Sequence, residues 1–535
     1  MWRRNLLFIG LVVGGFLALR ASLFPLRAAR GPVPAEASAA IAPVTVDPVV
    51  GEVNAAFRAQ WDKQNLKAAP PAPQFAVVRR LSLVLTGTIP SLEELRQLEQ
   101  VPPERQVDWW LDHLLRDRRF ADYFAERLAR TYVGTEDGPF IVYRRRRFVS
   151  WLSDQLIANR PYGELVRELI AADGLWTDHP ATNFITVTIQ ENKVTPERLA
   201  ARVTRAFLGV RLDCAQCHDA KFEPWTQKDF HGLAAFFGQT KQGFTGIYDA
   251  REGEHKMEIH ATGKKEVVGP AVPFNADLLP TDGTPRSQLA RWVTDPRNEY
   301  FARATAQRVW ALMFGRSMKG PVDSVNGLDN LPTPLLVLAR DFTVHNHDLH
   351  RLIRVIAATE VFRMDSAAPH EITEAHEEAW AAFGLTRLRP EQVVGAVQQA
   401  ASVKTIDRDS NFFVRLAYYG GEKDFVRRYG DTGEDEFAGQ GGTIPQRLIL
   451  MNGSIVKEKT KDELFNAANL IAGMAADDHS AVEIAYLVVL TRKPTTEEAQ
   501  HFAKRLEGSK GKDRAHRMED IYWTLINSTE FSWNH

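Results

Sequence analysis

The sequence predicts a mainly α-helical protein in which two helical domains are joined by a small β-containing connector. Apolar residues recur at helical spacing along most of the chain after residue 51. One such stripe consists of Ala302, Ala306, Val309, Trp310 and Met313. Capping signals are also frequent, whereas stretches that alternate apolar and polar residues are few and short.

Length and charge narrow the class of protein. A chain of 535 residues exceeds what one hydrophobic core usually holds, which favours more than one domain. Its 66 basic and 67 acidic residues give a net charge of -1. Because nucleic-acid binding needs a basic excess, we expect no nucleic-acid partner.

The N-terminus predicts export. Arg3 and Arg4 precede an uncharged, mostly apolar run over 6–19, which is short for a membrane span and typical of a signal peptide. Residues 1–30 are therefore predicted to be a signal peptide or, as the alternative, an uncleaved anchor in the inner membrane. Residues 31–50, rich in Ala and Pro, are predicted to be a tether. The protein would then act in the periplasm or at the cell surface.

The first helical domain is predicted over 51–245. Ser91 stands three residues before Glu94, the pattern of a capping box at a helix start. Thr195 followed by Pro196 marks a second start, and that helix is expected to end near Gly209. A short strand is expected where Ile185, Val187 and Ile189 alternate with threonines.

The connector is predicted over 246–285, with a hairpin that turns at Gly263. The second helical domain is predicted over 286–535. It repeats the capping signal at Thr495 and Glu498. Within it, Arg308 is expected to be partly buried against an acid such as Asp323.

The strongest chemical signal is the segment RLDCAQCHDAKFEPWTQ. It contains Cys214 and Cys217, the only two cysteines of the chain, followed directly by His218. In c-type cytochromes a Cys-x-x-Cys-His segment binds haem through two thioether bonds, and the histidine ligates the iron. The motif therefore predicts covalent haem c, with His218 as the proximal ligand.

Two other interpretations stay open. The thiols and His218, with a distant histidine or acid, could form a zinc site, although adjacent ligands at 217 and 218 are awkward for a tetrahedral ion. Alternatively, Cys214 and Cys217 could pair as a local disulfide in an oxidising compartment.

The distal iron ligand is not fixed by the motif. Candidates near it in sequence are Met257, His231, His255 and His260. The stretch around the motif is also rich in aromatic residues that either enclose a macrocycle or belong to the core: Phe207, Phe222, Trp225, Phe230, Phe236 and Phe237.

Longer segments carry a resemblance. AFLGVRLDCAQCHDAKFEPWTQKDFHGLAAFF and RRLSLVLTGTIPSLEELRQL resemble a planctomycete-type cytochrome-associated domain family of unknown function. PRSQLARWVTDPRNEYFARATAQRVWALMFGRSM and TIPQRLILMNG resemble the companion domain that usually follows it. The resemblance implies an exported, mostly helical protein with haem c. Relatives commonly have a second histidine two residues after the motif histidine, where this chain has Ala220.

Two functions follow as hypotheses. The first is a redox protein that transfers electrons to a partner protein or, as a haem c oxidoreductase, oxidises a small substrate. The second is a haem-free binding or scaffold protein at the cell surface with a Cys214–Cys217 disulfide. A hydrolase acting on an extracellular polymer is a weaker third, suggested only by the tryptophan content and export.

Overall fold

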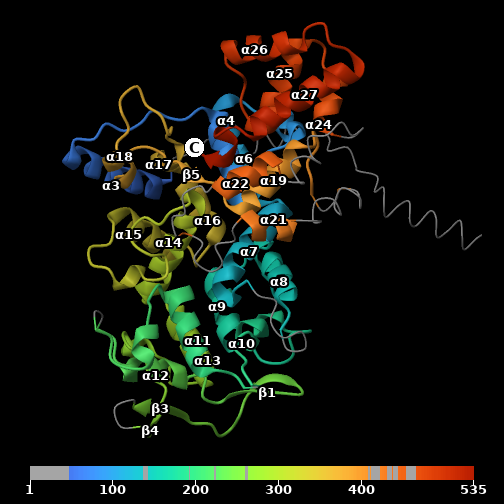
Figure 1. The fold of residues 1–535 in the computed structure, drawn as a ribbon. Helices are drawn as coiled ribbons and strands as arrows, with labels where there is room; N and C mark the ends of the chain where they lie inside the picture. The colour runs from blue at the N-terminus through green and yellow to red at the C-terminus, as the bar shows by residue number, and fades with distance from the viewer. Residues whose placement is uncertain are drawn as a thin grey trace, which may run out of the picture.

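The computed structural model describes residues 47–135, 143–191, 193–221, 224–259, 263–407, 410, 422–429, 437, 444–452 and 466–535. The protein is mainly α, as predicted. Helices α25 to α27 lie at one end of the molecule, and α12 with strands β3 and β4 lies at the other (Figure 1).

Most of the described residues before the cysteine motif are helical. These helices are α3 (Pro48–Gln64), α4 (Gln74–Thr86), α5 (Leu92–Leu98), α6 (Gln106–Leu115), α7 (Arg118–Val133), α8 (Arg145–Ile157), α9 (Tyr162–Ala171), α10 (Asn183–Thr186) and α11 (Pro196–Val203). Those after the motif are α12 (Gln227–Ala235), α13 (Pro285–Val293), α14 (Glu299–Phe314), α15 (Thr333–Val344), α16 (Leu349–Ala358), α17 (Glu360–Arg363), α18 (Glu374–Glu378), α19 (Pro390–Ala400), α21 (Glu422–Tyr429), α22 (Ile444–Asn452), α24 (Ala467–Met474), α25 (Asp478–Leu490), α26 (Thr496–Leu506) and α27 (Gly511–Ile526).

The predicted helix starts are confirmed. Ser91 and Glu94 form a reciprocal capping box at the start of α5, and Thr495 and Glu498 form another at the start of α26. Thr195 occupies the N-cap of α11, although its side chain makes no capping bond there. Reciprocal side-chain capping therefore marks the starts of α5 and α26, whereas α11 starts at a proline in its first turn.

The β structure of the described residues consists of three two-stranded antiparallel sheets. The strands are β1 (Thr240–Gly243), β2 (Gly246–Asp249), β3 (His255–Ile259), β4 (Lys264–Val268), β5 (Thr386–Arg387) and β6 (Trp533–Asn534). The hairpin predicted around Gly263 is confirmed as the β3–β4 pair, and Gly263 has the positive φ of +65° that a tight turn needs.

The strand expected over 185–189 is wrong. Asn183–Thr186 forms the short helix α10, and turns follow it. The amide of Val187 donates to the Asn183 carbonyl, and the Thr188 hydroxyl donates to the Ile185 carbonyl. These local bonds use backbone groups that would otherwise pair with a neighbouring strand. The alternation of apolar residues and threonines therefore did not indicate a strand here.

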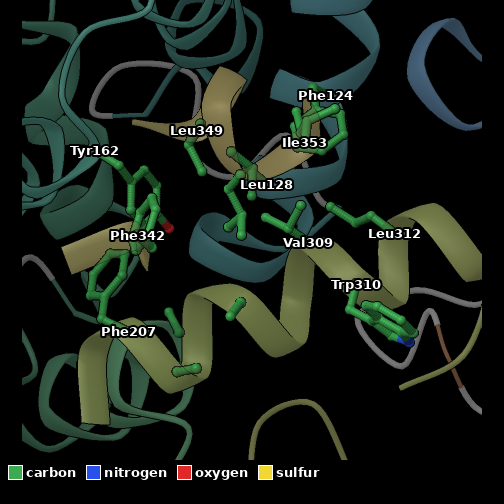
Figure 2. Packing of buried hydrophobic residues seen from close by; sticks show 14 of the residues in the cluster. Phe124, Leu128, Tyr162, Phe207, Val309, Trp310, Leu312, Phe342, Leu349 and Ile353 are labelled. Atoms are coloured by element: carbon green, nitrogen blue, oxygen red, sulfur yellow. The ribbon is translucent and has the colours of Figure 1, made fainter. Parts of the chain in front are cut away.

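The larger hydrophobic cluster surrounds α14. This helix is buried on nearly every side, and Figure 2 shows its Val309, Trp310 and Leu312 against side chains from neighbouring helices. Phe124 and Leu128 come from α7, and Ile353 comes from α16. The predicted apolar stripe of α14 therefore lies in the core.

Two hydrophobic clusters divide the buried residues. One runs from Val49 to Phe383 and adds Leu487, and the other gathers residues from Leu388 to Phe531 with Leu83 and Ile89 of the N-terminal part. Helix α4 contributes to both, through Leu81 and Leu83 respectively. The larger cluster thus includes residues from both predicted helical domains, and the domain borders predicted from the sequence stay a prediction.

The expected contact between Arg308 and Asp323 is wrong. Arg308 is buried, but its guanidinium donates to the Thr131 hydroxyl at 2.8 Å and to the Arg205 carbonyl. Asp323 instead pairs with Arg211. Neutral oxygen acceptors therefore satisfy much of this buried cation, which sequence spacing could not indicate.

Among the described residues, the helices are too short or too polar to span a bilayer. The predicted signal peptide or anchor (1–30) lies outside the described residues, as does the tether (31–50) up to residue 46. Helix α3 begins at Pro48, where Asp47 accepts a capping bond from the amide of Val49.

Candidate functional site

The chain enters the motif through a helix that ends abruptly. Helix α11 continues as a π-helical turn over Thr204–Leu208 and stops at Gly209, whose φ is +57°. A Cβ at Gly209 would lie 2.7 Å from Val325 Cγ1, so both the conformation and the close packing favour glycine.

The cysteines lie on an exposed turn. A 3₁₀ turn spans Asp213–Gln216, and it is anchored by Leu212 and Ala215, whose side chains are buried. Cys214 and Cys217 face outward as exposed, free thiols. Because Leu212 and Ala215 are buried, the turn is held against the core while both sulfur atoms stay on the surface.

His218 is also exposed, and its ring nitrogens are distinguished by one contact. Its Nδ1 lies 2.8 Å from the carbonyl oxygen of Asp219. Because a carbonyl can only accept, Nδ1 carries the proton in this bond, and the lone pair of a neutral ring is on Nε2. In this arrangement Nε2 is the ring nitrogen whose lone pair is available to a metal.

The segment after the motif is held by polar contacts. The Asp219 carboxylate accepts from the amide of Gln227 at 2.8 Å, and the Gln227 side chain donates to the carbonyls of Gln216 and Glu258. Helix α12 begins there with a capping box between Thr226 and Asp229. These bonds tie the turn to α12 and to the β3–β4 hairpin.

The aromatic residues near the motif belong to the core where the structure describes them. Phe207, Phe230, Phe236 and Phe237 are at most 1% exposed, and Trp225 is also buried. Phe222 lies outside the described residues. These five aromatic residues therefore belong to the hydrophobic core. They do not form an exposed apolar surface beside the described part of the turn.

Of the four candidate distal ligands, the three that the structure describes are buried. His231 on α12 and His255 on β3 are buried, and His231 Nδ1 lies 2.9 Å from His255 Nε2. Met257 is buried on β3, where it pairs across the hairpin with Glu266. His260 lies outside the described residues. Which of them ligates iron stays a prediction.

Both nitrogens of His231 are engaged. Its Nε2 lies 3.0 Å from the carbonyl of Gln216, within the motif turn, and its Nδ1 faces His255. A histidine needs a free ring nitrogen if it is to ligate iron. His231 instead contacts the backbone of the turn that carries the thiols, so iron ligation by His231 would require it to leave these bonds.

Sequence reasoning missed one residue at this place. Glu197, in the first turn of α11, lies 3.9 Å from His255 Nε2. Burial lowers the pKa of His255 below its ordinary value, while Glu197 acts in the opposite direction. No short-range spacing links residues 197, 231 and 255. They meet because α12 packs against both α11 and β3.

The comparisons with known proteins concern the domains. Residues 52–242 match PSCyt2, a protein of unknown function (DUF1549), and residues 285–412 match PSD1, a protein of unknown function (DUF1553). No curated protein and no solved structure matches the chain. The exposed cysteine turn falls within the first match, and the resemblance drawn from the sequence is confirmed. The chain therefore belongs to the proteins in which a PSCyt2 (DUF1549) domain is followed by a PSD1 (DUF1553) domain.

Proposed function

We propose that the protein is an exported c-type haem protein that transfers single electrons to a partner protein. Cys214 and Cys217 would hold the haem through thioether bonds, and His218 would be its proximal ligand. A bound haem supplies a one-electron ferric–ferrous couple. The observation that carries the proposal is the combination of two exposed free thiols with an adjacent imidazole whose lone pair is on Nε2.

The residues of the turn suit this attachment. Each thiol adds across a vinyl group, so that sulfur bonds to one carbon and hydrogen to the other, and no oxidant is consumed. The exposure of Cys214 and Cys217 makes both sulfurs accessible to an attachment machinery. The bond from His218 Nδ1 to the Asp219 carbonyl orients the ring, as is usual for metal-ligating histidines.

The exposure of the turn favours electron transfer over oxidation of a small substrate. The described aromatic residues that could have enclosed a haem are packed in the core. A haem on this turn would keep an edge accessible to solvent and to a docking partner. A substrate reaction at iron would instead need an enclosed distal pocket.

A pyridine haemochrome spectrum tests the proposal. The full chain is produced together with a cytochrome c maturation machinery and then extracted with acidic acetone. We expect one haem per chain to stay in the protein, and none in the Cys214→Ala/Cys217→Ala variant. The His218→Ala variant should keep covalent haem but show altered iron ligation, whereas His516→Ala, at an exposed histidine of α27, should match the wild type. Complete extraction of haem from the wild type, while a known cytochrome c made in the same cells retains it, would refute the proposal and favour the haem-free scaffold.

A further inference from the structure

Glu197, His231 and His255 form a cluster directly behind the motif turn. One ligand atom from each lies within 4.8 Å of the others. His231 Nδ1 and His255 Nε2 are 2.9 Å apart, and a Glu197 carboxylate oxygen lies 3.9 Å from His255 Nε2. Two imidazoles and a carboxylate therefore converge from α11, α12 and β3.

The cluster is largely removed from water. The side chain of His255 is 4% exposed, His231 is also buried, and a quarter of the Glu197 side chain is exposed. Close backbone packing supports this burial. A Cβ at Gly238 would lie 3.2 Å from both the Cβ and the backbone nitrogen of His255, so glycine permits β3 to lie against the end of α12.

The hydrogen bonds orient the nitrogen atoms toward one another. His231 Nε2 must donate to the Gln216 carbonyl, because that oxygen can only accept. In a neutral His231, Nδ1 then carries a lone pair that points at His255 Nε2. A histidine that ligates a metal commonly donates its other N–H to a backbone carbonyl, and His231 has this arrangement.

We propose that this cluster is a binding site for one divalent transition-metal ion of the Zn²⁺ type. The ligands would be His231 Nδ1, His255 Nε2 and the Glu197 carboxylate. Two histidines and one glutamate leave a fourth position open, as in metal sites that bind water or substrate. With zinc–nitrogen bonds of about 2.0–2.1 Å, the two nitrogens need to be about 3.3 Å apart, a shift of roughly half an ångström from the structure.

A second cluster shows why the charge balance matters. Glu94, His113 and Asp117 also offer three ligand atoms within 4.8 Å. There the Arg119 guanidinium ion-pairs with both Glu94 and Asp117. Burial by itself would raise the pKa of Glu94, but the charge of Arg119 and hydrogen bonds to the carboxylate hold it far below its usual range. A cation therefore already neutralises that cluster, whereas the contact of Glu197 is with a histidine that loses its proton when it binds a metal.

Metal titration of the full chain tests the proposal. The protein is made without haem-attachment machinery in a Cys214→Ser/Cys217→Ser background, stripped with a chelator, and titrated with Co²⁺ and then Zn²⁺. We expect one ion per chain by elemental analysis and visible Co²⁺ absorption without thiolate charge-transfer bands. Glu197→Gln and His255→Asn should each lower the affinity by about tenfold or more.

The matched control is Glu258→Gln, which changes an exposed glutamate on β3 and should leave the affinity unchanged. Circular dichroism shows whether each variant is folded. If His255→Asn unfolds, the affinity of Glu197→Gln still tests the proposal. If the folded background protein binds no ion, or if Glu197→Gln and Glu258→Gln bind alike, the cluster is a structural hydrogen-bond pair and the proposal is wrong. Because no haem is present, this result is independent of the proposed haem attachment.

Discussion

The motif turn and the histidine pair behind it meet at the Gln216 carbonyl, and they differ in exposure and in bonding. Cys214, Cys217 and His218 face solvent. His231 and His255 are buried, bonded to each other, and fixed by helix and strand packing. We therefore expect that the exposed residues of the turn can be altered with little effect on the fold, whereas altering the buried pair changes both the proposed metal site and the stability of the turn.

Burial disfavours the charged form of a histidine, and His347, which lies away from the site, allows this effect to be measured. Burial lowers its pKa to about 4, with a further contribution from Arg167. In the unfolded chain, His347 binds a proton near pH 6.5, whereas in the folded protein it does so only near pH 4. The folded protein therefore has its full stability above pH 6.5 and loses stability as the pH falls from 6.5 toward 4. We expect the free energy of unfolding to fall by about 2–3 kcal/mol across this window, measured by urea denaturation.

The control for this pH dependence is His347→Asn. His347 has a φ of +58°, a conformation that asparagine tolerates well. This variant should show a smaller loss between pH 6.5 and 4 than the wild type. An equal loss in both proteins would assign the pH dependence to other groups.

A pair of substitutions compares the two regions directly. His231→Ala removes the bonds to Gln216 and His255, takes the hydrogen-bond partner from the buried Nε2 of His255, and leaves a cavity in place of a buried ring, so we expect a loss of about 2 kcal/mol. His218→Ala removes an exposed side chain and should change stability by less than about 0.5 kcal/mol in the haem-free chain. Urea denaturation of both variants measures the two losses of stability. Equal losses would contradict the expected difference between the buried pair and the exposed turn.

A loss smaller than that of His231→Ala is expected at the link between the two regions. Thr226 caps α12, the helix that carries His231, through reciprocal bonds with Asp229. Thr226→Ala should cost about 1 kcal/mol and lower the midpoint of thermal unfolding. Thr226→Ser keeps the hydroxyl and should restore most of the loss, whereas a serine variant as unstable as the alanine variant would argue against a capping role.

Local signals in the sequence predicted well what local bonds determine. The capping boxes at Ser91 and Thr495 and the hairpin around Gly263 depend on residues within a few positions of one another, and all three are present. The prediction of a strand near Ile185 failed because the Thr188 side chain and local turns bind the backbone groups of this stretch. Two-residue alternation over so short a stretch does not separate these outcomes.

In the candidate site, too, the residues close in sequence could be predicted, whereas those brought together by packing could not. The spacing of Cys214, Cys217 and His218 is visible in the sequence, and the structure adds that they are exposed. Glu197 could not be found, because it meets His255 only through the packing of α11, α12 and β3. The partners of Arg308 were missed for the same reason, since Thr131 and Arg205 come from distant helical segments.

The intact mass of the protein, made with a cytochrome c maturation machinery, shows directly whether haem is attached to the cysteine turn. We expect the mass of the mature chain plus one whole haem, and no increment in the Cys214→Ser/Cys217→Ser variant. A wild-type mass equal to that of the reduced chain, or about 2 Da lower because Cys214 and Cys217 are joined, would contradict it.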